Sequence, residues 1–220
     1  MTDALKIGVL VSGNGTNLQA IIDAIENKEL NAKISVVLSN KKTAFALERA
    51  RKYGLTAVYV DPAPFENRER YEQEIVRHLR DSGAQWIVLA GYMKMITSEL
   101  LSAYRNHILN IHPSLLPAFT GLHAQAQALS YGVKITGCTV HLVDEGLDSG
   151  PVIVQAAVPV LESDTVDTLK SRILEKEHEI YPQALKWIAE GKLKVEGRKV
   201  RILSSRNPLI SEPINPGVKK

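Results

Sequence analysis

The chain has 220 residues, 45% hydrophobic and 23% charged, with a formal net charge of +3, a composition that is ordinary for one globular domain. Its single cysteine, Cys138, excludes an intramolecular disulfide and favours a cytoplasmic setting. No apolar segment is long enough for a signal peptide or a membrane span, and the basic residues are scattered, so we expect neither a membrane nor a nucleic-acid partner.

Short apolar runs alternate with amphipathic stretches over the first half of the chain. They predict strands at 6–11, 34–38, 57–60, 86–90 and 108–111, and helices at 18–25, 44–53, 71–79 and 98–104. Strands that alternate with helices form βαβ units, which build a parallel sheet with helices on both faces. The predicted fold class is therefore α/β, doubly wound and mostly parallel.

The pattern changes after residue 135. Apolar strands at 136–143 and 152–160 flank the turn-rich segment DEGLDSGP, which predicts an antiparallel extension of the sheet. A long helical pattern follows at 165–190, and we expect Pro182 to kink it or to start a new turn. We predict one domain over 1–203, with halves at about 1–105 and 106–203, and a flexible tail at 204–220.

The first strand runs directly into Ser12-Gly-Asn-Gly-Thr-Asn17, where a helix begins. Glycines let backbone N–H groups turn toward an anion, and the start of a helix adds unpaired N–H donors. This favours a phosphate site, although a tight turn capped by Thr16 or Asn17 explains the same residues. Leu18 stands where a dinucleotide fingerprint needs glycine, and no acidic residue ends the second strand, so a single phosphate fits better.

The segment NIHPSLLP, residues 110–117, places an amide and an imidazole at the end of the fifth strand. Asn110 and His112 point to the same face if the strand continues through them, and the two prolines limit the movement of the imidazole. A carboxylate from the segment Asp144–Asp148 would orient the ring and support charge on it. Together, an amide, an imidazole and a carboxylate suit an acyl-transfer site.

No serine or cysteine is placed as a nucleophile, because Cys138 lies within a strand and Ser114 has no base beside it. We therefore expect direct attack by a substrate amine and no covalent acyl-enzyme. No spacing of histidines and cysteines matches a metal site, and we expect no metal. Among the other histidines, His141 is expected to be a structural residue of the sheet, whereas His123 lies in a loop from which it could contact a ligand.

Five segments occur in an order and spacing that resemble the phosphoribosylglycinamide formyltransferase family of purine biosynthesis: VSGNGTNLQAII, AGYMKMI, NIHPSLLP, VDEGLDSGPVI and EKEHEIYP. The resemblance covers residues 6–195. It implies the formyltransferase fold, with a ribonucleotide-binding half followed by a folate-binding and catalytic half. It also implies transfer of a formyl group from 10-formyltetrahydrofolate, a co-substrate, to the amine of phosphoribosylglycinamide. The implied partners are small molecules, and the implied state is a monomer or a small homo-oligomer.

The resemblance also implies roles for individual residues. Asn110, His112 and Asp148 match the catalytic trio, in which Asn110 and His112 stabilise an oxyanion and Asp148 orients His112 and relays a proton. The substrate-binding positions are Gly15, Thr16, Asn17 and Glu177. The folate-contact positions are Arg68, Met93, Lys94, Met95, Ile96, Asn110, Asp144, Glu145, Gly146 and Leu147. The loop at 118–130, where Thr120 replaces an expected proline, is predicted to be mobile.

Three alternatives share parts of this pattern. A formyltetrahydrofolate deformylase uses the same trio with water as acceptor, but is expected to carry an N-terminal regulatory domain, for which a first strand at Lys6 leaves no room. A methionyl-tRNA formyltransferase shares the SLLP element, but is expected to add a C-terminal domain and not to need the SGNG loop. A non-catalytic nucleotide-binding module would explain the glycine loop and leave the trio unexplained.

Overall fold

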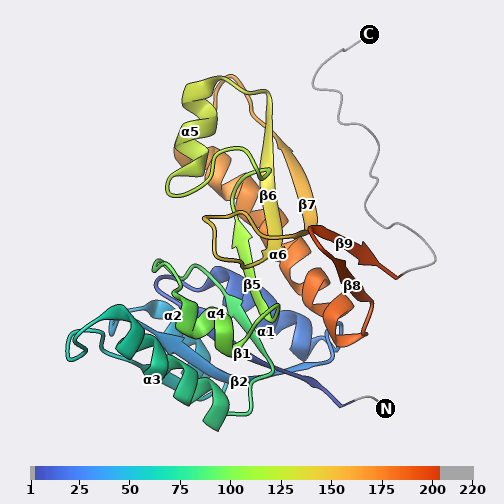
Figure 1. Cartoon of the computed structure of the whole chain (residues 1–220). Coiled ribbons are helices and arrows are strands. Elements are labelled where there is room, and N and C mark those ends of the chain that lie inside the picture. Colours follow the sequence, from blue (N-terminus) through green and yellow to red (C-terminus); the bar gives the residue numbers. More distant parts are fainter. Residues whose placement is uncertain (1–2, 204–220) are drawn as a thin grey trace.

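The strands β1 to β7 of the computed structural model coincide with the short apolar runs of the sequence (Figure 1). The structure describes residues 3–203, so the predicted tail at 204–220 lies outside the described residues. One seven-stranded sheet has the order β3-β2-β1-β4-β5-β6-β7. The strand bounds are β1 Leu5–Val11, β2 Ala32–Ser39, β3 Ala57–Tyr59, β4 Trp86–Leu89, β5 Ile108–His112, β6 Ile135–Leu142 and β7 Val152–Pro159.

Strands β1 to β5 pair in parallel, whereas β6 and β7 add to the sheet in antiparallel. Helices cover both faces. Ile7, Val9 and Val11 of β1 pack in one core cluster and Leu10 in the other, because alternate side chains of a strand point to opposite faces. The doubly wound α/β fold with an antiparallel extension is therefore confirmed. One face carries α1 (Thr16–Glu26), α2 (Phe45–Lys52) and α6 (Val166–Ala189), and the other carries α3 (Arg68–Asp81) and α4 (Ser98–Ala103).

The direction of winding reverses at β1. β2 and β3 lie on one side of it, and β4 and β5 lie on the other. In open α/β sheets, ligands bind beyond the carboxyl ends of the strands at such a reversal. The segments that follow β1, β4 and β5 therefore meet where a ligand is expected.

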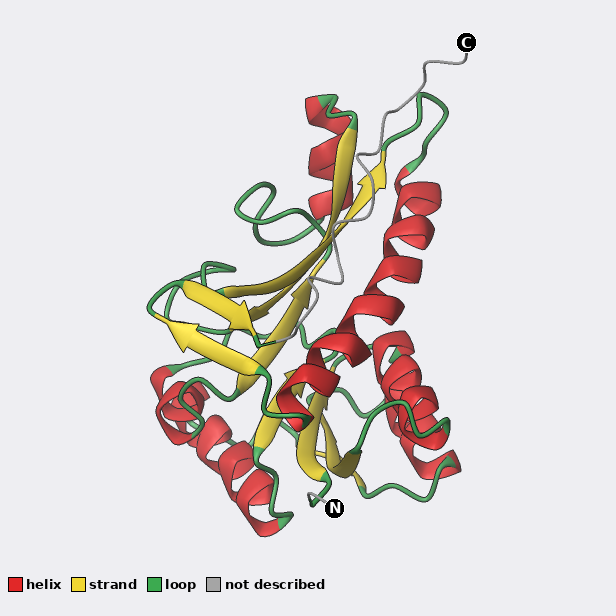
Figure 2. Cartoon of the chain, turned by 90° about the vertical axis from the view of Figure 1, so that its right-hand side faces the viewer, coloured by secondary structure: helices red, strands yellow, loops and turns green. Residues whose placement is uncertain are grey.

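Helix α6 is continuous and runs along the sheet, although Pro182 lies inside it (Figure 2). The expectation that Pro182 starts a new turn was wrong. The neighbouring Tyr181 is fully buried, and its hydroxyl contacts the carbonyl oxygens of Leu89 and Leu109 at 3.0 and 3.2 Å. Such packing favours the continuous helix against the roughly 3 kcal/mol that a proline costs inside it. Neither α6 nor any other helix within residues 3–203 is long and apolar enough to cross a membrane.

Two regular elements were not predicted. The segment 118–130 was expected to lack regular structure, but Ala124–Tyr131 forms helix α5, which ends at the left-handed Gly132 (φ 82°). A hairpin of β8 (Leu193–Glu196) and β9 (Lys199–Ile202) follows α6. This hairpin reaches back to the loop between β6 and β7, because Arg198 donates a hydrogen bond to the carbonyl oxygen of Ser149.

Candidate active site

The glycine loop between β1 and α1 has its carbonyl groups fixed by α2. The Gly13 carbonyl oxygen accepts the N–H of Ala46 at 3.1 Å, and the Asn14 carbonyl oxygen accepts the Nε–H of Arg49 at 2.9 Å. In a trans peptide, a carbonyl and the following N–H point in opposite directions. The N–H groups of Asn14 and Gly15 therefore point away from α2, as an anion-binding turn requires.

Gly15 is the N-cap of α1 and adopts the left-handed conformation (φ 74°), with no side-chain cap on the helix. The alternative of a turn capped by Thr16 or Asn17 was therefore wrong. The first turn of α1 keeps its N–H donors for a ligand, and these donors favour a negative charge. A Cβ atom on Gly15 would lie 2.5 Å from the Cβ of Ala46, so α2 packs too closely to allow a side chain here.

Asn17 and Glu177 join α1 to α6 beneath this loop. The Asn17 amide donates to Glu177 Oε2 at 2.7 Å, and both side chains are buried. Burial raises the pKa of Glu177 from 4.5 to about 7, although the hydrogen bond from Asn17 offsets part of this effect. Glu177 is thus a carboxyl group that changes charge near neutral pH.

Strand β5 brings Asn110 and His112 to the same face, and the loop after β6 brings Asp148 against them. His112 Nδ1 lies 3.3 Å from Asp148 Oδ2, and the two side chains are 6% and 11% exposed. Asp148 has a left-handed backbone (φ 49°) and accepts the N–H of Gly121 at 2.8 Å. The structure therefore brings together the amide, imidazole and carboxylate that the sequence singled out.

His141 belongs to this cluster, although the sequence suggested only a structural role. It stands opposite Asn110 in the β5–β6 pairing. Its Nδ1 contacts the Leu142 carbonyl oxygen at 2.9 Å, and its Nε2 contacts Asn110 Nδ2 at 3.1 Å. A carbonyl only accepts, so Nδ1 carries the proton. Burial lowers the pKa of His141, so Nε2 stays unprotonated and accepts one N–H of Asn110. The second N–H of Asn110 remains for a ligand.

The imidazole of His112 is held on its other side by the following loop. Its Nε2 lies 2.8 Å from the Phe119 carbonyl oxygen. Phe119 and His123 both have left-handed backbones, with φ of 53° and 61°. Such conformations are strained for non-glycine residues and gather at functional sites. His123 begins α5, and its side chain is exposed.

Thr139 of β6 anchors the turn that follows His112, a contact that the sequence analysis missed. Its hydroxyl donates to the Ser114 carbonyl oxygen at 2.7 Å and accepts the N–H of Leu116 at 3.1 Å. Gln155 of β7 adds a hydrogen bond to the Leu116 carbonyl oxygen at 2.9 Å. The turn is thus fixed by neighbouring strands as well as by its prolines.

The segment after β4 carries Met93, Lys94, Met95 and Ile96, and the two methionines are 65% and 63% exposed. Glu72 of α3, itself 3% exposed, holds the end of this segment by accepting the N–H and hydroxyl of Thr97 at 2.7–3.0 Å. Arg68 begins α3. Burial raises the pKa of the nearby Tyr92 hydroxyl, and the charge of Arg68 offsets a small part of this rise. The exposed methionines offer apolar surface to a flat ligand.

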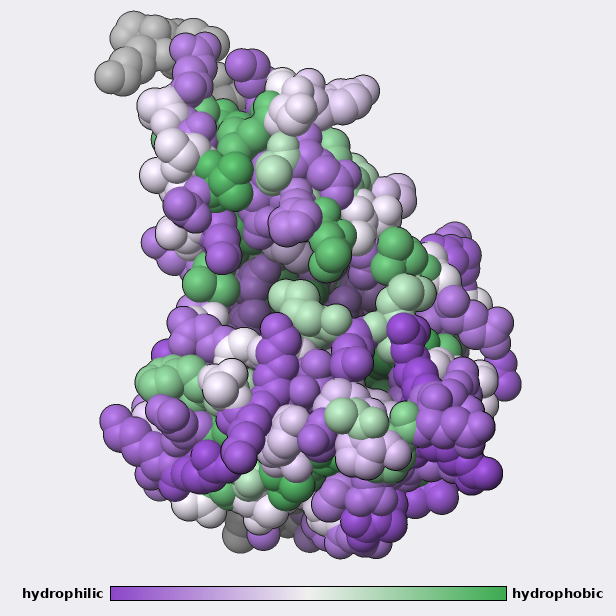
Figure 3. Space-filling view, turned by 90° about the vertical axis from the view of Figure 1, so that its left-hand side faces the viewer, coloured by the Kyte–Doolittle hydropathy of each residue, from purple (hydrophilic) through white to green (hydrophobic). Residues whose placement is uncertain are grey.

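The loop after β6 carries Asp144, Glu145, Gly146 and Leu147, and Leu147 is 56% exposed. The Asp144 carboxylate accepts the N–H of Gly146 at 3.1 Å and the hydroxyl of Ser149 at 2.6 Å, which closes the loop on itself. Figure 3 shows this side of the molecule, with a hollow between the part that carries α5 and the part that carries α2 and α3, and with apolar and polar side chains around it.

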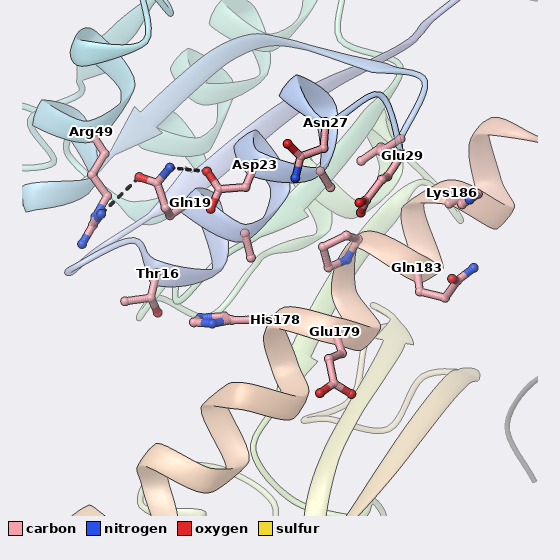
Figure 4. Close-up of a pocket in the computed structure, with 14 residues that line it drawn as sticks. Thr16, Gln19, Asp23, Asn27, Glu29, Arg49, His178, Glu179, Gln183 and Lys186 are labelled. Carbon is pink, nitrogen blue, oxygen red and sulfur yellow. Dashed lines mark hydrogen bonds between the residues drawn. The ribbon is translucent and has the colours of Figure 1, made fainter. Parts of the chain in front are cut away.

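A groove of about 710 Å³ lies between α1 and α6, outside the trio (Figure 4). Thr16, Arg49 and His178 line its end nearest the glycine loop, and Asp23, Glu29 and Lys186 line the remainder. Charges of both signs line it, and none of Asn110, His112 and Asp148 reaches it. The three residues therefore lie apart from this groove.

Residues 3–203 contain no group of three or more histidine, cysteine or acidic side chains arranged to hold a metal ion. Cys138 is fully buried in β6, and burial raises the pKa of its thiol, so it is unsuited to nucleophilic attack. Asn110, His112 and Asp148 are groups that can supply hydrogen bonds and transfer protons.

Comparison with known proteins gives consistent matches. The family model described as formyl transferase matches residues 5–185. The phosphoribosylglycinamide formyltransferase of Escherichia coli is 42% identical over 93% of this chain and 96% of its own length. The trifunctional purine biosynthetic protein adenosine-3 of Drosophila pseudoobscura is 46% identical, but the chain spans only 14% of it. The crystal structure of glycinamide ribonucleotide transformylase 1 from Symbiobacterium toebii superposes with a TM-score of 0.91 at 51% identity, covering 93% of this chain and 96% of that one.

Proposed function

The chain belongs to the phosphoribosylglycinamide formyltransferase family, and on this premise we propose that it transfers the formyl group of 10-formyltetrahydrofolate to the amine of 5'-phosphoribosylglycinamide in purine biosynthesis. One observation carries the proposal. The anion-binding turn after β1 and the cluster of Asn110, His112 and Asp148 lie at the same edge of one sheet. The turn suits a phosphate, and the cluster suits acyl transfer.

The ribonucleotide binds with its phosphate on the N–H groups of Asn14 to Asn17. Glu177 lies beneath this turn, and its carboxyl group contacts the part of the ribonucleotide beyond the phosphate. The folate lies across the exposed apolar side chains of Met93, Met95 and Leu147, with Arg68, Lys94, Ile96 and the loop Asp144–Gly146 around it. In this arrangement the amine and the formyl group meet at the end of β5.

The amine attacks the formyl carbon directly and forms a tetrahedral oxyanion. The N–H of Asn110 that His141 does not use donates to this oxygen, and protonated His112 donates a second hydrogen bond when the formyl oxygen replaces the Phe119 carbonyl. Asp148 orients His112 and relays the proton of the amine to the departing folate nitrogen, directly or through water. The bond from the formyl carbon to that nitrogen then breaks.

Three further expectations complete the proposal. Residues up to about 105 form the ribonucleotide-binding half, and residues 106–203 form the folate-binding and catalytic half. The enzyme works as a monomer or small homo-oligomer. It acts in the cytoplasm, where its free thiol at Cys138 stays reduced.

The test is a formyl-transfer assay with phosphoribosylglycinamide and, separately, water as acceptor. We expect transfer to the amine by the native protein, and a loss of at least ~10²-fold in kcat for His112→Ala and Asp148→Asn, since each acts on the transition state. His78→Ala on α3, which pairs only with Glu74 in the described structure, is the control and keeps its activity. Release of formate with water but no transfer to the amine would instead identify a deformylase.

A further inference from the structure

Ser12 lies between the two loops that the proposed function assigns to the two substrates. It is 3% exposed. Its hydroxyl donates to Asn40 Oδ1 at 2.6 Å and accepts the N–H of Met93 at 2.8 Å, and its own N–H donates to the Gly91 carbonyl oxygen at 3.1 Å. Ser12 therefore begins the phosphate turn and also holds the start of the folate-contact segment.

The hydroxyl makes a contact that the sheet cannot make. The pairing of β1 with β4 ends at Leu10 and Leu89, and two backbone hydrogen bonds extend it to Gly91. Gly91 then turns into the left-handed region (φ 74°), and the chain leaves the plane of the sheet. Beyond that point the N–H of Met93 has no strand beside it, and the Ser12 side chain supplies its acceptor.

Asn40 sets the direction of this hydrogen bond. A hydroxyl has one proton and two lone pairs, and its proton is engaged by Asn40 at the end of β2. A lone pair therefore faces Met93. One hydroxyl, on a residue that is 3% exposed, therefore links three neighbouring strands, β2, β1 and β4, at their carboxyl ends.

We propose that Ser12 is a positioning residue that couples the ribonucleotide site to the formyl-donor site, an inference that rests on the proposed function. A phosphate bound to the N–H groups after Ser12 fixes this turn, and the hydroxyl then fixes Met93 and the folate-contact segment. Coupling between two binding sites is reciprocal, so each ligand tightens the other by the same factor. Loss of one buried hydrogen bond accounts for roughly a 3- to 10-fold change in that factor.

The experiment uses a pair of ligands that cannot react, tetrahydrofolate and phosphoribosylglycinamide. Calorimetry gives the Kd of tetrahydrofolate with and without saturating ribonucleotide, and the ratio of the two values is the coupling factor. We expect a factor of several-fold for the native protein and a factor near one for Ser12→Ala. Asn40→Ala leaves the Ser12 hydroxyl in place but removes the group that accepts its proton, so we expect an intermediate coupling factor. This variant replaces Ser12→Ala in the experiment if Ser12→Ala does not fold.

Glu72→Gln is the contrasting variant. Glu72 holds the other end of the same segment through Thr97 but does not touch the phosphate turn. It should raise the Kd of tetrahydrofolate while the coupling factor stays at its native value. Three results would each overturn the proposal. The first is a coupling factor of one for the native protein, and the second is an unchanged coupling factor for Ser12→Ala. The third is a coupling factor that falls as far for Glu72→Gln as for Ser12→Ala. The assay of formyl transfer by the native protein is independent of these results and tests the proposed function separately.

Discussion

The buried carboxyl group of Glu177 predicts that stability falls as the pH rises toward neutrality. Its pKa is raised in the folded protein, chiefly by burial, from 4.5 to about 7. A raised pKa means that the folded state binds the proton more tightly than the unfolded chain does. Protonated Glu177 therefore contributes to the free energy of unfolding. This contribution is fully present below pH 4.5 and is lost as the pH rises through 7. Glutamine has the same shape and never ionises, so Glu177→Gln should abolish this loss.

The size of the effect follows from the two pKa values. Each tenfold change in proton affinity is worth about 1.4 kcal/mol, so the rise from 4.5 to about 7 corresponds to about 3 kcal/mol. At pH 8 Glu177→Gln should therefore be more stable than the native protein by up to about 3 kcal/mol, or roughly 6–12 °C in Tm for a chain of this size. At pH 4.5 the two proteins should have nearly equal stability.

Urea unfolding between pH 4.5 and 8.5 measures this difference, with the fluorescence of Trp187 on the same helix as one signal. Glu179→Gln is the matched control, since Glu179 lies two residues away but its side chain is 61% exposed. The difference in unfolding free energy between Glu179→Gln and the native protein should not grow with pH. A stability difference for Glu177→Gln that stays constant over the whole range would refute the reasoning. We also expect Glu177→Gln to bind the ribonucleotide more weakly, so the carboxyl group reduces stability in favour of function.

Two further substitutions test the packing around the site. Gly15→Ala should lose binding of the ribonucleotide and destabilise the fold by more than Gly54→Ala. Both glycines have positive φ, but only at Gly15 would the added Cβ lie 2.5 Å from the Cβ of Ala46. Urea unfolding and a binding titration compare the two variants. Thr139→Val should cost about 1–3 kcal/mol and lower kcat, because it leaves two buried backbone groups without partners. Thr136→Val on the same strand removes a buried hydroxyl with no partner in the described structure, so its unfolding free energy should stay equal or rise.

The fold followed from the sequence where burial is continuous or periodic. Parallel strands covered on both faces are uniformly apolar, and the helices on them repeat apolar residues at helical spacing. Helix α5 was not predicted because its buried residues are only Ala124 and Ala128, and two alanines give a weak helical repeat of apolar residues. In the β8–β9 hairpin, β8 exposes its last three side chains and β9 exposes alternate ones, and the turn between them depends on the left-handed Gly197 (φ 61°). Its pattern therefore resembles that of a surface loop.

From its residues alone, the candidate site was predictable as far as single strands and the loops that follow them. Asn110 and His112 share a face because side chains alternate along a strand, and this needs no partner strand. The roles of His141 and Thr139 depend on the register of β6, which places them opposite Asn110 and His112. A slip of one residue would turn both side chains to the other face, and the sequence contains no direct record of register.

The two histidines of the cluster show why composition alone could not assign them. His141 faces a carbonyl oxygen and an amide N–H, and a neutral ring satisfies both partners. His112 faces a carbonyl oxygen and the carboxylate of Asp148, and only a ring that carries both protons can donate to both. The same residue type on neighbouring strands thus performs two tasks. His141 holds the amide of Asn110 in one orientation, and in the proposed mechanism His112 presents charge to the reacting oxygen. The difference arises entirely from the atoms that each ring meets.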